Sequence, residues 1–258
     1  MTTVLDCQRD GDITILTLNH PKTRNALSAD MLIELHDRLL EAAGDTACRA
    51  VILMGAGGHF CTGGDISSMT PGREVLAARQ RIERAHRVIR LLVGGPKPVV
   101  AAVEGYAFGA GLSLAMACDV VVSSSTAKYA AVFAKVGLIP DMGLLWTLPQ
   151  RVGVGESRKL FFSSRTVEAQ EALQLGMVDH VIEPDELLAV ALATAKELTA
   201  TAPLSVAVTK AAYAKGAVTL EDVLRTEVEQ QPMLYQSQDH NEAIAAFREK
   251  RKSTFKGV

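Results

Sequence analysis

Two glycine-rich segments could direct backbone N–H groups at a ligand. Thr62-Gly63-Gly64 and Gly109-Ala110-Gly111 each follow a short apolar run of the strand type. Residues with little or no side chain let a ligand approach the backbone closely, and the second segment stands where a helix is expected to begin. One N–H from each segment, aimed at a single carbonyl oxygen, would form an oxyanion hole. Spacing alone also allows both segments to be ordinary tight strand-to-helix turns.

An isolated carboxylate is the second chemical feature. Asp141 lies in the otherwise apolar stretch 137–143, with Phe133 and Trp146 close in sequence. Apolar neighbours raise the pKa of a carboxyl group, which suits it to proton transfer. The alternative is that Asp141 caps the helix that follows. Asp65, directly after the first glycine segment, could contact a ligand or fix its loop, and we favour the structural role.

Other motifs for chemistry are incomplete. Phe60 stands where a GxGxxG motif would need its third glycine, and no P-loop occurs, so we predict no dinucleotide site. The run from Gly111 to Ala115 resembles a GxSxG elbow, but it lacks the last glycine and places Ser113 inside a helix. Such a hydrolase would also need a histidine base. His180 and His240 are available in the sequence, but no motif assigns either of them this role. The six histidines show no HExxH spacing, and we predict no metal site.

A basic run closes the chain. Lys250-Arg251-Lys252 has Lys256 and Phe247 nearby. Positive charges with an aromatic side chain beside them could bind the phosphates and base of a nucleotide-like group. The alternative is a solvated helix end whose positive charges suit the helix dipole.

The expected elements alternate between strands and helices in the first part of the chain. A hairpin is predicted around Asp10-Gly11, and Ser28 is the expected N-cap of a helix that ends at Gly44. The remaining expected strands are 50–54, 99–103 and 119–123, and the helices are an Arg-rich one over 73–93 and then 112–118, 156–162, 167–175, 185–198, 204–215, 220–235 and 239–252. This order predicts an α/β layered core with partly parallel strands.

Composition narrows the possible classes. The chain has 258 residues, 48% of them hydrophobic and 22% charged, with a net charge of -2, so we expect a packed domain that does not bind nucleic acid. The apolar stretch 98–117 is broken by Glu104 and glycines, and we expect no membrane segment and no secretory signal. The four cysteines form no CxxC pair, which predicts reduced, mostly buried thiols in a cytoplasmic protein.

These pieces together resemble one family. The chain is similar to the crotonase superfamily, the enoyl-CoA hydratase/isomerase group, over its whole length and in order. The matching segments are 19–22 with 25–27, 60–66, 96–119, 137–149 and 246–251. The resemblance implies an α/β spiral of ββα units with its acyl-CoA site in residues 1–200. A helical region over 201–258 would contact CoA and form a homotrimer or a dimer of trimers.

The resemblance also implies a ligand and a site. The substrate would be an acyl-CoA thioester, with no separate cofactor because coenzyme A is part of the substrate. The N–H groups of Gly64 and Ala110 would form the oxyanion hole. The implied acyl pocket consists of Thr62, Asp65, Ile66, Met69, Leu112, Phe133, Leu138 and Trp146. The implied CoA contacts are Lys22, Arg24, Ala26, Phe247 and Lys250, the last two commonly across a subunit boundary.

Departures from the family pattern bear on the reaction. The two glutamates with which family hydratases add water are replaced by Ser113 and Phe133. Asp141 falls where some family isomerases, and the family's 4-chlorobenzoyl-CoA dehalogenase, place a catalytic aspartate. We therefore expect a double-bond isomerase with Asp141 as the proton carrier. The alternatives are an enoyl-CoA hydratase, dehalogenase-like or hydrolytic chemistry with Asp141 as nucleophile, and a non-catalytic CoA-thioester-binding protein.

Overall fold

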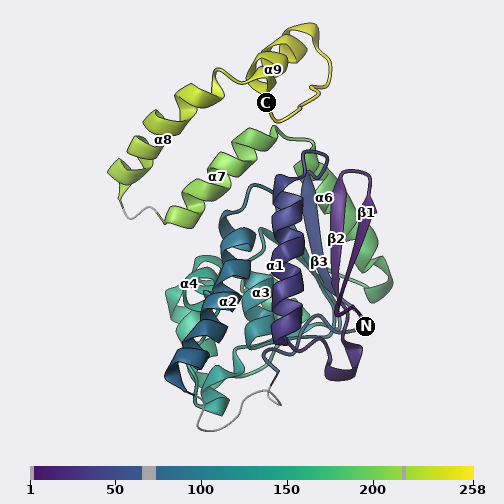
Figure 1. Ribbon diagram of the computed structural model, residues 1–258, viewed down its shortest axis with the longest axis vertical. Coiled ribbons are helices and arrows are strands. Elements are labelled where there is room, and N and C mark those ends of the chain that lie inside the picture. The colour runs from purple at the N-terminus through teal and green to yellow at the C-terminus, as the bar shows by residue number, and fades with distance from the viewer. Residues whose placement is uncertain (1–2, 66–73, 217–218) are drawn as a thin grey trace.

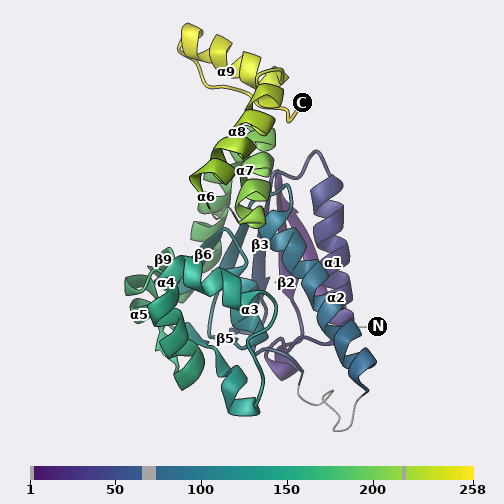
Figure 2. The same ribbon diagram turned by 90° about the vertical axis from the view of Figure 1, so that its left-hand side faces the viewer.

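The computed structural model describes residues 3–65, 74–216 and 219–258 (Figure 1). Ile66 and Met69 of the implied acyl pocket lie outside this described part. The elements form a layered body, from which the last two helices project (Figures 1 and 2).

A six-stranded sheet forms the centre of the body. Its order is β1-β2-β3-β4-β6-β9, with β1 and β2 antiparallel and the other neighbours parallel. These strands are Leu5–Asp10, Ile13–Leu18, Ala50–Gly55, Val99–Val103, Val120–Ser124 and His180–Ile182. A second sheet has the order β5-β7-β8, and its strands are Tyr106–Phe108, Lys128–Ala130 and Val167–Glu168. The predicted hairpin and the partly parallel sheet are confirmed.

Helices cover both faces of the large sheet, and its inner strands β2, β3 and β4 are buried on both sides. On one face the core includes Leu16, Leu53 and Val103 of the strands, packed against α1 (Ala29–Gly44) and α2 (Val75–Gly94). On the other face alternate strand residues pack against α6 (Leu187–Thr199). The other helices are α3 (Ala110–Met116), α4 (Leu144–Ser163), α5 (Ala169–Gln174), α7 (Pro203–Lys215), α8 (Leu220–Leu234) and α9 (Gln238–Glu249), with short 3₁₀ turns at Pro21–Thr23, Val132–Val136 and Pro184–Glu186.

The helix α1 begins as its sequence predicts. The hydroxyl of Ser28 accepts a hydrogen bond from the N–H of Met31 at 3.1 Å, and the helix buries Leu35 and Leu39. By contrast, α4 begins well before the predicted residue 156. The sequence pattern of its first half does not predict a helix, because Pro149 and Gly153 interrupt it. The backbone leaves helical geometry at Gly153, with φ 76° and ψ 160°, so the predicted helix corresponds to the half beyond this break.

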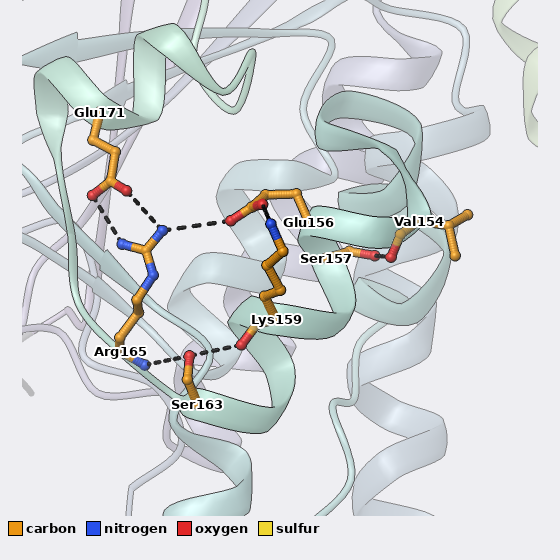
Figure 3. Close-up of polar contacts among 7 residues, drawn as sticks. All are labelled: Val154, Glu156, Ser157, Lys159, Ser163, Arg165 and Glu171. Atoms are coloured by element: carbon orange, nitrogen blue, oxygen red, sulfur yellow. Dashed lines mark hydrogen bonds and ion pairs between the residues drawn. The ribbon is translucent and has the colours of Figure 1, made fainter.

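A polar cluster joins the end of α4 to α5. The guanidinium of Arg165 lies 2.7 Å from a carboxylate oxygen of Glu171 and 3.5 Å from one of Glu156, which also accepts from Lys159 (Figure 3). The cluster orders the connection between the two helices on the outside of the body. Such partly exposed pairs stabilise a fold by small amounts each.

The C-terminal helices attach to the body through α7. The ammonium of Lys210, which is 5% exposed, lies 2.5 Å from a carboxylate oxygen of Asp119 and donates to the carbonyl of Lys97 at 2.8 Å. Beyond this contact α8 and α9 extend away from the sheet (Figure 2). They carry exposed apolar side chains such as Val228, at 75%, and Phe247, at 85%. Exposed apolar surface of this kind is typical of protein–protein contacts.

Replacing Lys210 with methionine is expected to destabilise the protein by about 2–3 kcal/mol, because Asp119 then loses its cation and the carbonyl of Lys97 loses its donor. Urea unfolding at fixed protein concentration measures the change. Lys215→Met, on the exposed end of the same helix, is the matched control and is expected to change stability by less than about 0.5 kcal/mol. Equal effects of the two variants would contradict the structural role of the ion pair.

No single described helix is long and apolar enough to cross a membrane. The segments Pro184–Thr199 and Pro203–Lys215 pass the same test of length and composition only when joined across a bend of 102°.

Candidate active site

The two glycine-rich segments lie side by side. Cys61 and Ala107 form a parallel β-bridge, the N–H of Cys61 donates to the carbonyl of Tyr106 at 2.8 Å, and the N–H of Phe108 donates to the carbonyl of Cys61 at 3.0 Å. These bonds run the first segment along β5 toward the start of α3. Segments that are 40 or more residues apart in sequence therefore meet at the point where α3 begins.

Glycine is required where the two segments touch. A Cβ atom on Gly111 would lie 2.1 Å from the carbonyl oxygen of Cys61, and one on Gly63 would lie 2.9 Å from the carbonyl oxygen of Phe108. The same Cβ atom on Gly63 would lie 3.5 Å from the backbone nitrogen of Ala110, and the φ of Gly63 is +103°. The two segments are therefore not independent turns, because their glycines allow the backbone of one to contact the backbone of the other.

The N–H groups of Gly64 and Ala110 are oriented by their neighbours. Leu27 accepts from the N–H of Asp65 at 3.2 Å and donates to the carbonyl of Gly63 at 2.7 Å. In a parallel bridge the residue between two such partners directs its own N–H away from the bridge. Ala110 is the first residue of α3, where the helix supplies no acceptor for its N–H. Neither N–H group is therefore used by the bridge or by the helix.

Asp141 is tied to the helix that begins at Ala110. The hydroxyl of Ser113, fully buried in α3, donates to the backbone carbonyl of Asp141 at 3.1 Å and to that of Gly109 at 3.3 Å. The N-cap of α4 is Gly143, and no side chain caps this helix, so Asp141 does not have the alternative capping role. Ser113 thus holds the turn of Asp141 against the second glycine segment.

The carboxyl group of Asp141 has an environment suited to proton transfer. The residue is partly buried, and its Oδ1 atom is buried with no hydrogen-bond partner in the described part of the chain. Burial raises the pKa of Asp141 above its ordinary value of 3.8, and the positive charges of Arg81 and His86 oppose this rise. A carboxylate with an unpaired oxygen and a raised pKa is a stronger base than an exposed one.

Helix α2 supplies the positive charges that act on this carboxyl group. Arg81, Ala85 and Ile89 are spaced four residues apart, and Ala85 and Ile89 are buried on the inner face of α2. A Cβ atom on Gly143 would lie 3.3 Å from Cγ2 of Ile89, so this face packs against the turn of Asp141. The Arg-rich character of the helix is visible in the sequence, but which arginines face inward depends on the packing.

A cavity of 340 Å³ opens between α1 and α2 beside the first glycine segment. Its lining residues come from the start of α1, from the residue after Gly64 and from α2, and they are Leu27, Ser28, Ala29, Leu32, Asp65, Ala77, Gln80, Arg81 and Arg84. Of the residues implied for the acyl pocket, Asp65 lines this cavity. Thr62 connects two loops, since its hydroxyl donates to the carbonyl of Thr23 at 3.1 Å.

Four other implied pocket residues are not part of the lining of this cavity. Leu112 and Phe133 are buried in the core, at 2% and 5% exposure, and Leu138 is 49% exposed. Trp146 lines two grooves between α4 and α7 that do not include Asp141, and its indole lies close to Gly216. The structure therefore does not place Trp146 in one pocket with Asp141. The start of α4 directs this side chain toward α7.

The implied CoA contacts fall into two groups. Lys22, Arg24 and Ala26 lie in and just after the turn Pro21–Thr23, where the guanidinium of Arg24 lies 5.4 Å from the ring centre of Tyr106. Phe247 and Lys250 lie at the end of α9, which stands beyond α7 and away from α3 in both views (Figures 1 and 2). One chain by itself does not bring the two groups together.

The cysteines and the possible metal ligands of the described residues bear on whether the site could do thiol or metal chemistry. Cys48, Cys61 and Cys118 are buried, and Cys7 is exposed. Burial raises the pKa of the Cys61 thiol to about 12, so this thiol beside the glycine segment stays protonated near neutral pH. Within the described residues, no group of three or more histidine, cysteine, aspartate or glutamate side chains could hold a metal ion.

Residues 8–258 match the protein family described as Enoyl-CoA hydratase/isomerase. The chain is 35% identical over 247 residues to the short-chain-enoyl-CoA hydratase of Clostridium acetobutylicum, covering 95% of this chain and 94% of that protein. It is 32% identical over 249 residues to the 1,2-epoxyphenylacetyl-CoA isomerase of Escherichia coli, covering 95% of each. The crystal structure of an enoyl-CoA hydratase from Bacillus anthracis superposes with a TM-score of 0.92 at 29% identity, covering 99% of this chain and 100% of that one. The predicted crotonase-type α/β fold is confirmed.

Proposed function

Because the chain belongs to the enoyl-CoA hydratase/isomerase family, we propose that it shifts a carbon–carbon double bond in an acyl-CoA thioester with Asp141 as the proton carrier. The single observation that carries this proposal is the environment of Asp141. Its carboxyl group is partly buried, has an unpaired Oδ1 atom in the described part of the chain, and is tied through Ser113 to the helix that starts at Ala110.

The proposed reaction needs one base and one pair of donors. The N–H groups of Gly64 and Ala110 hold the thioester oxygen. The carboxylate of Asp141 takes a proton from the α-carbon of a 3-enoyl thioester, and the electron pair moves onto that oxygen as an enolate. The same carboxyl group returns the proton to the γ-carbon, so the double bond moves next to the thioester. Neither water nor a cofactor is consumed.

The positions of the family's glutamates favour isomerisation over hydration. Ser113 is a hydroxyl that holds the turn of Asp141, and Phe133 is an apolar side chain in the core. Neither can activate a water molecule as a carboxylate base. An apolar residue at the second position also keeps the surroundings of the enolate dry, which raises the basicity of Asp141.

Coenzyme A is proposed to bind between subunits. Lys22, Arg24 and Ala26 would contact it from the subunit that holds the thioester, and Phe247 and Lys250 would contact it from a neighbour. This arrangement is supported by the distance of α9 from the body and by the 85% exposure of Phe247 (Figure 2). We propose a homotrimer or a dimer of trimers, formed by the helical region 201–258 and acting in the cytoplasm.

Hydration is the second candidate function, because the relative from Clostridium acetobutylicum is named a hydratase. It would require a carboxylate other than the replaced pair. Nucleophilic attack by Asp141 would leave an acyl or aryl ester on that side chain, which mass measurement of the protein after a single turnover would detect. A non-catalytic CoA-thioester-binding protein would show no turnover that depends on Asp141.

The pH dependence of the reaction gives the test of this proposal. Because the base form of Asp141 is needed, kcat/KM for isomerisation is expected to rise with pH through the pKa of Asp141, with a midpoint above 3.8. Removing the nearby positive charge with Arg81→Gln is expected to move the midpoint to higher pH. A rate profile over pH, measured with 3-enoyl-CoA, determines both midpoints.

The matched control for this profile is Arg90→Gln, which changes an exposed arginine of the same helix. Its midpoint is expected to coincide with that of the wild type. A midpoint that moves down in Arg81→Gln, or that moves equally in both variants, would contradict the assignment of the titrating base to Asp141.

A further inference from the structure

The cavity between α1 and α2 points to a class of substrate. We propose that it binds the distal end of the acyl group, and that Arg84, with Arg81 beside it, selects acyl groups ending in a carboxylate. This inference rests on the proposed acyl-CoA function and deepens it. It assigns a specificity role to a residue that the reaction itself does not use.

The cavity adjoins both parts of the proposed catalytic machinery. Leu27 and Asp65 both line it, and Leu27 is hydrogen-bonded to Gly63 and Asp65, the two neighbours of Gly64. The cavity therefore begins beside the first proposed donor of the oxyanion hole. Arg81, on its other wall, is close enough to Asp141 to lower the pKa of that carboxyl group. We expect the thioester oxygen to be held at Gly64 and the reacting carbons to face Asp141. The rest of the acyl group would then extend into this cavity.

The walls of the cavity differ in chemistry. Leu27, Ala29 and Leu32 form an apolar wall on the side of α1, which suits the methylene groups of an acyl chain. Gln80, Arg81 and Arg84 form the opposite wall on α2. A simple alkyl tail would gain nothing from two guanidinium groups, whereas a terminal carboxylate would be bound by charge-assisted hydrogen bonds.

Arg84 is the residue best placed to meet that carboxylate. Its side chain is partly buried, and no described residue pairs with its guanidinium. A partly buried, unpaired charge is unfavourable until an opposite charge arrives. By comparison, Arg79 points to the outer side of α2 and pairs with Glu83 at 2.8 Å.

The charges that face the cavity leave it positive. Asp65 is the acidic residue of the lining, against the two guanidinium groups of Arg81 and Arg84. Arg81 and Asp65 have interactions of their own, which leaves Arg84 to supply the charge for a ligand. Outside this lining, the positive charge of Arg81 also acts on the carboxyl group of Asp141.

Binding of unreactive thioesters tests the proposal. Saturated acyl-CoA thioesters from butanoyl to octanoyl would be compared by calorimetry with the ω-carboxylated thioesters of equal length, succinyl to suberyl. At its preferred length the wild type is expected to bind the carboxylated thioester about tenfold to a hundredfold more tightly. In Arg84→Gln the two affinities are expected to converge, and in the exposed control Arg90→Gln the difference is expected to persist.

Two results would overturn the proposal. One is equal affinity of the wild type for both series at every length, and the other is an equal loss of affinity for both series in Arg84→Gln. Because the thioesters are saturated, the result does not depend on turnover. Failure of the isomerase proposal would appear separately, as absent double-bond shift with 3-enoyl-CoA in a protein that still binds carboxylated thioesters.

Discussion

Replacing Asp141 with asparagine is expected to lower kcat for isomerisation of 3-enoyl-CoA by about a hundredfold to ten-thousandfold, because the amide cannot accept the proton. The two side chains have nearly the same shape, so the bound substrate is expected to keep its position. Stopped assays of the 3-enoyl and 2-enoyl thioesters by NMR measure the loss. Asp37→Asn, on an exposed residue of α1, is the matched control and is expected to keep wild-type activity.

The same substitution is expected to stabilise the fold at neutral pH. A carboxyl group whose pKa is raised in the folded state contributes stability below its unfolded pKa of 3.8, and that contribution is lost as pH rises through the folded pKa. Near pH 7 the buried charge of Asp141 therefore opposes folding, and the neutral amide removes it. Thermal unfolding should give a higher Tm for Asp141→Asn than for the wild type. Lower stability together with retained turnover would contradict a catalytic role and favour a structural one.

Replacing Gly111 with valine is expected to lower kcat by about a hundredfold to a thousandfold through the oxyanion hole. A Cβ atom at this position would lie 2.1 Å from the carbonyl oxygen of Cys61, so the two glycine segments must separate. The N–H of Ala110 then no longer lies where it meets the thioester oxygen together with the N–H of Gly64. Enoyl-CoA turnover and calorimetric affinity for a saturated acyl-CoA would be measured on the same protein.

The control for Gly111→Val is Gly155→Ala in α4, where a Cβ atom would meet nothing within 4 Å. It is expected to keep full activity and to gain up to about 1 kcal/mol of stability from the better helix former. Since Gly111→Val could impair folding, circular dichroism and the smaller change Gly111→Ala accompany it. A folded variant at position 111 with wild-type kcat would contradict the assignment of the oxyanion hole.

Much of the sheet was predictable because its signals are local. The hairpin around Gly11 and the Ser28 cap of α1 depend on residues within a few positions of each other. The buried strands Ala50–Gly55 and Val99–Val103 are short apolar runs, which identify a strand covered on both faces. Their parallel order followed from the helices expected between them.

The first half of α4 was not predictable in the same way. Pro149 removes a backbone donor and Gly153 leaves helical geometry, so the sequence lacks the uninterrupted pattern of a helix. The position of Trp146 follows from this missed segment. Its side chain faces α7 because α4 begins at Leu144. The packing of α4 against α7 involves segments that are far apart in the sequence.

The site was predictable to the extent that glycines imply close approach of backbone. The glycines at 63 and 111 indicated loops that could meet, and the structure brings them into contact through Cys61. The functions of Ser113 and Arg84 depend instead on tertiary packing. A serine inside a helix does not reveal that it will hold the turn of Asp141, and an Arg-rich helix does not reveal which arginine lines a cavity.

Proton transfer by Asp141 is tested most directly by comparing two reactions of the wild-type protein in one buffer. Isomerisation of 3-enoyl-CoA and hydration of 2-enoyl-CoA would be followed by NMR, with Asp141→Asn run in parallel. Isomerisation is expected to be the faster reaction and to be lost in the variant, while hydration is expected to stay near the uncatalysed background. Faster hydration that survives in Asp141→Asn would contradict proton transfer by Asp141, because another group would then carry the proton.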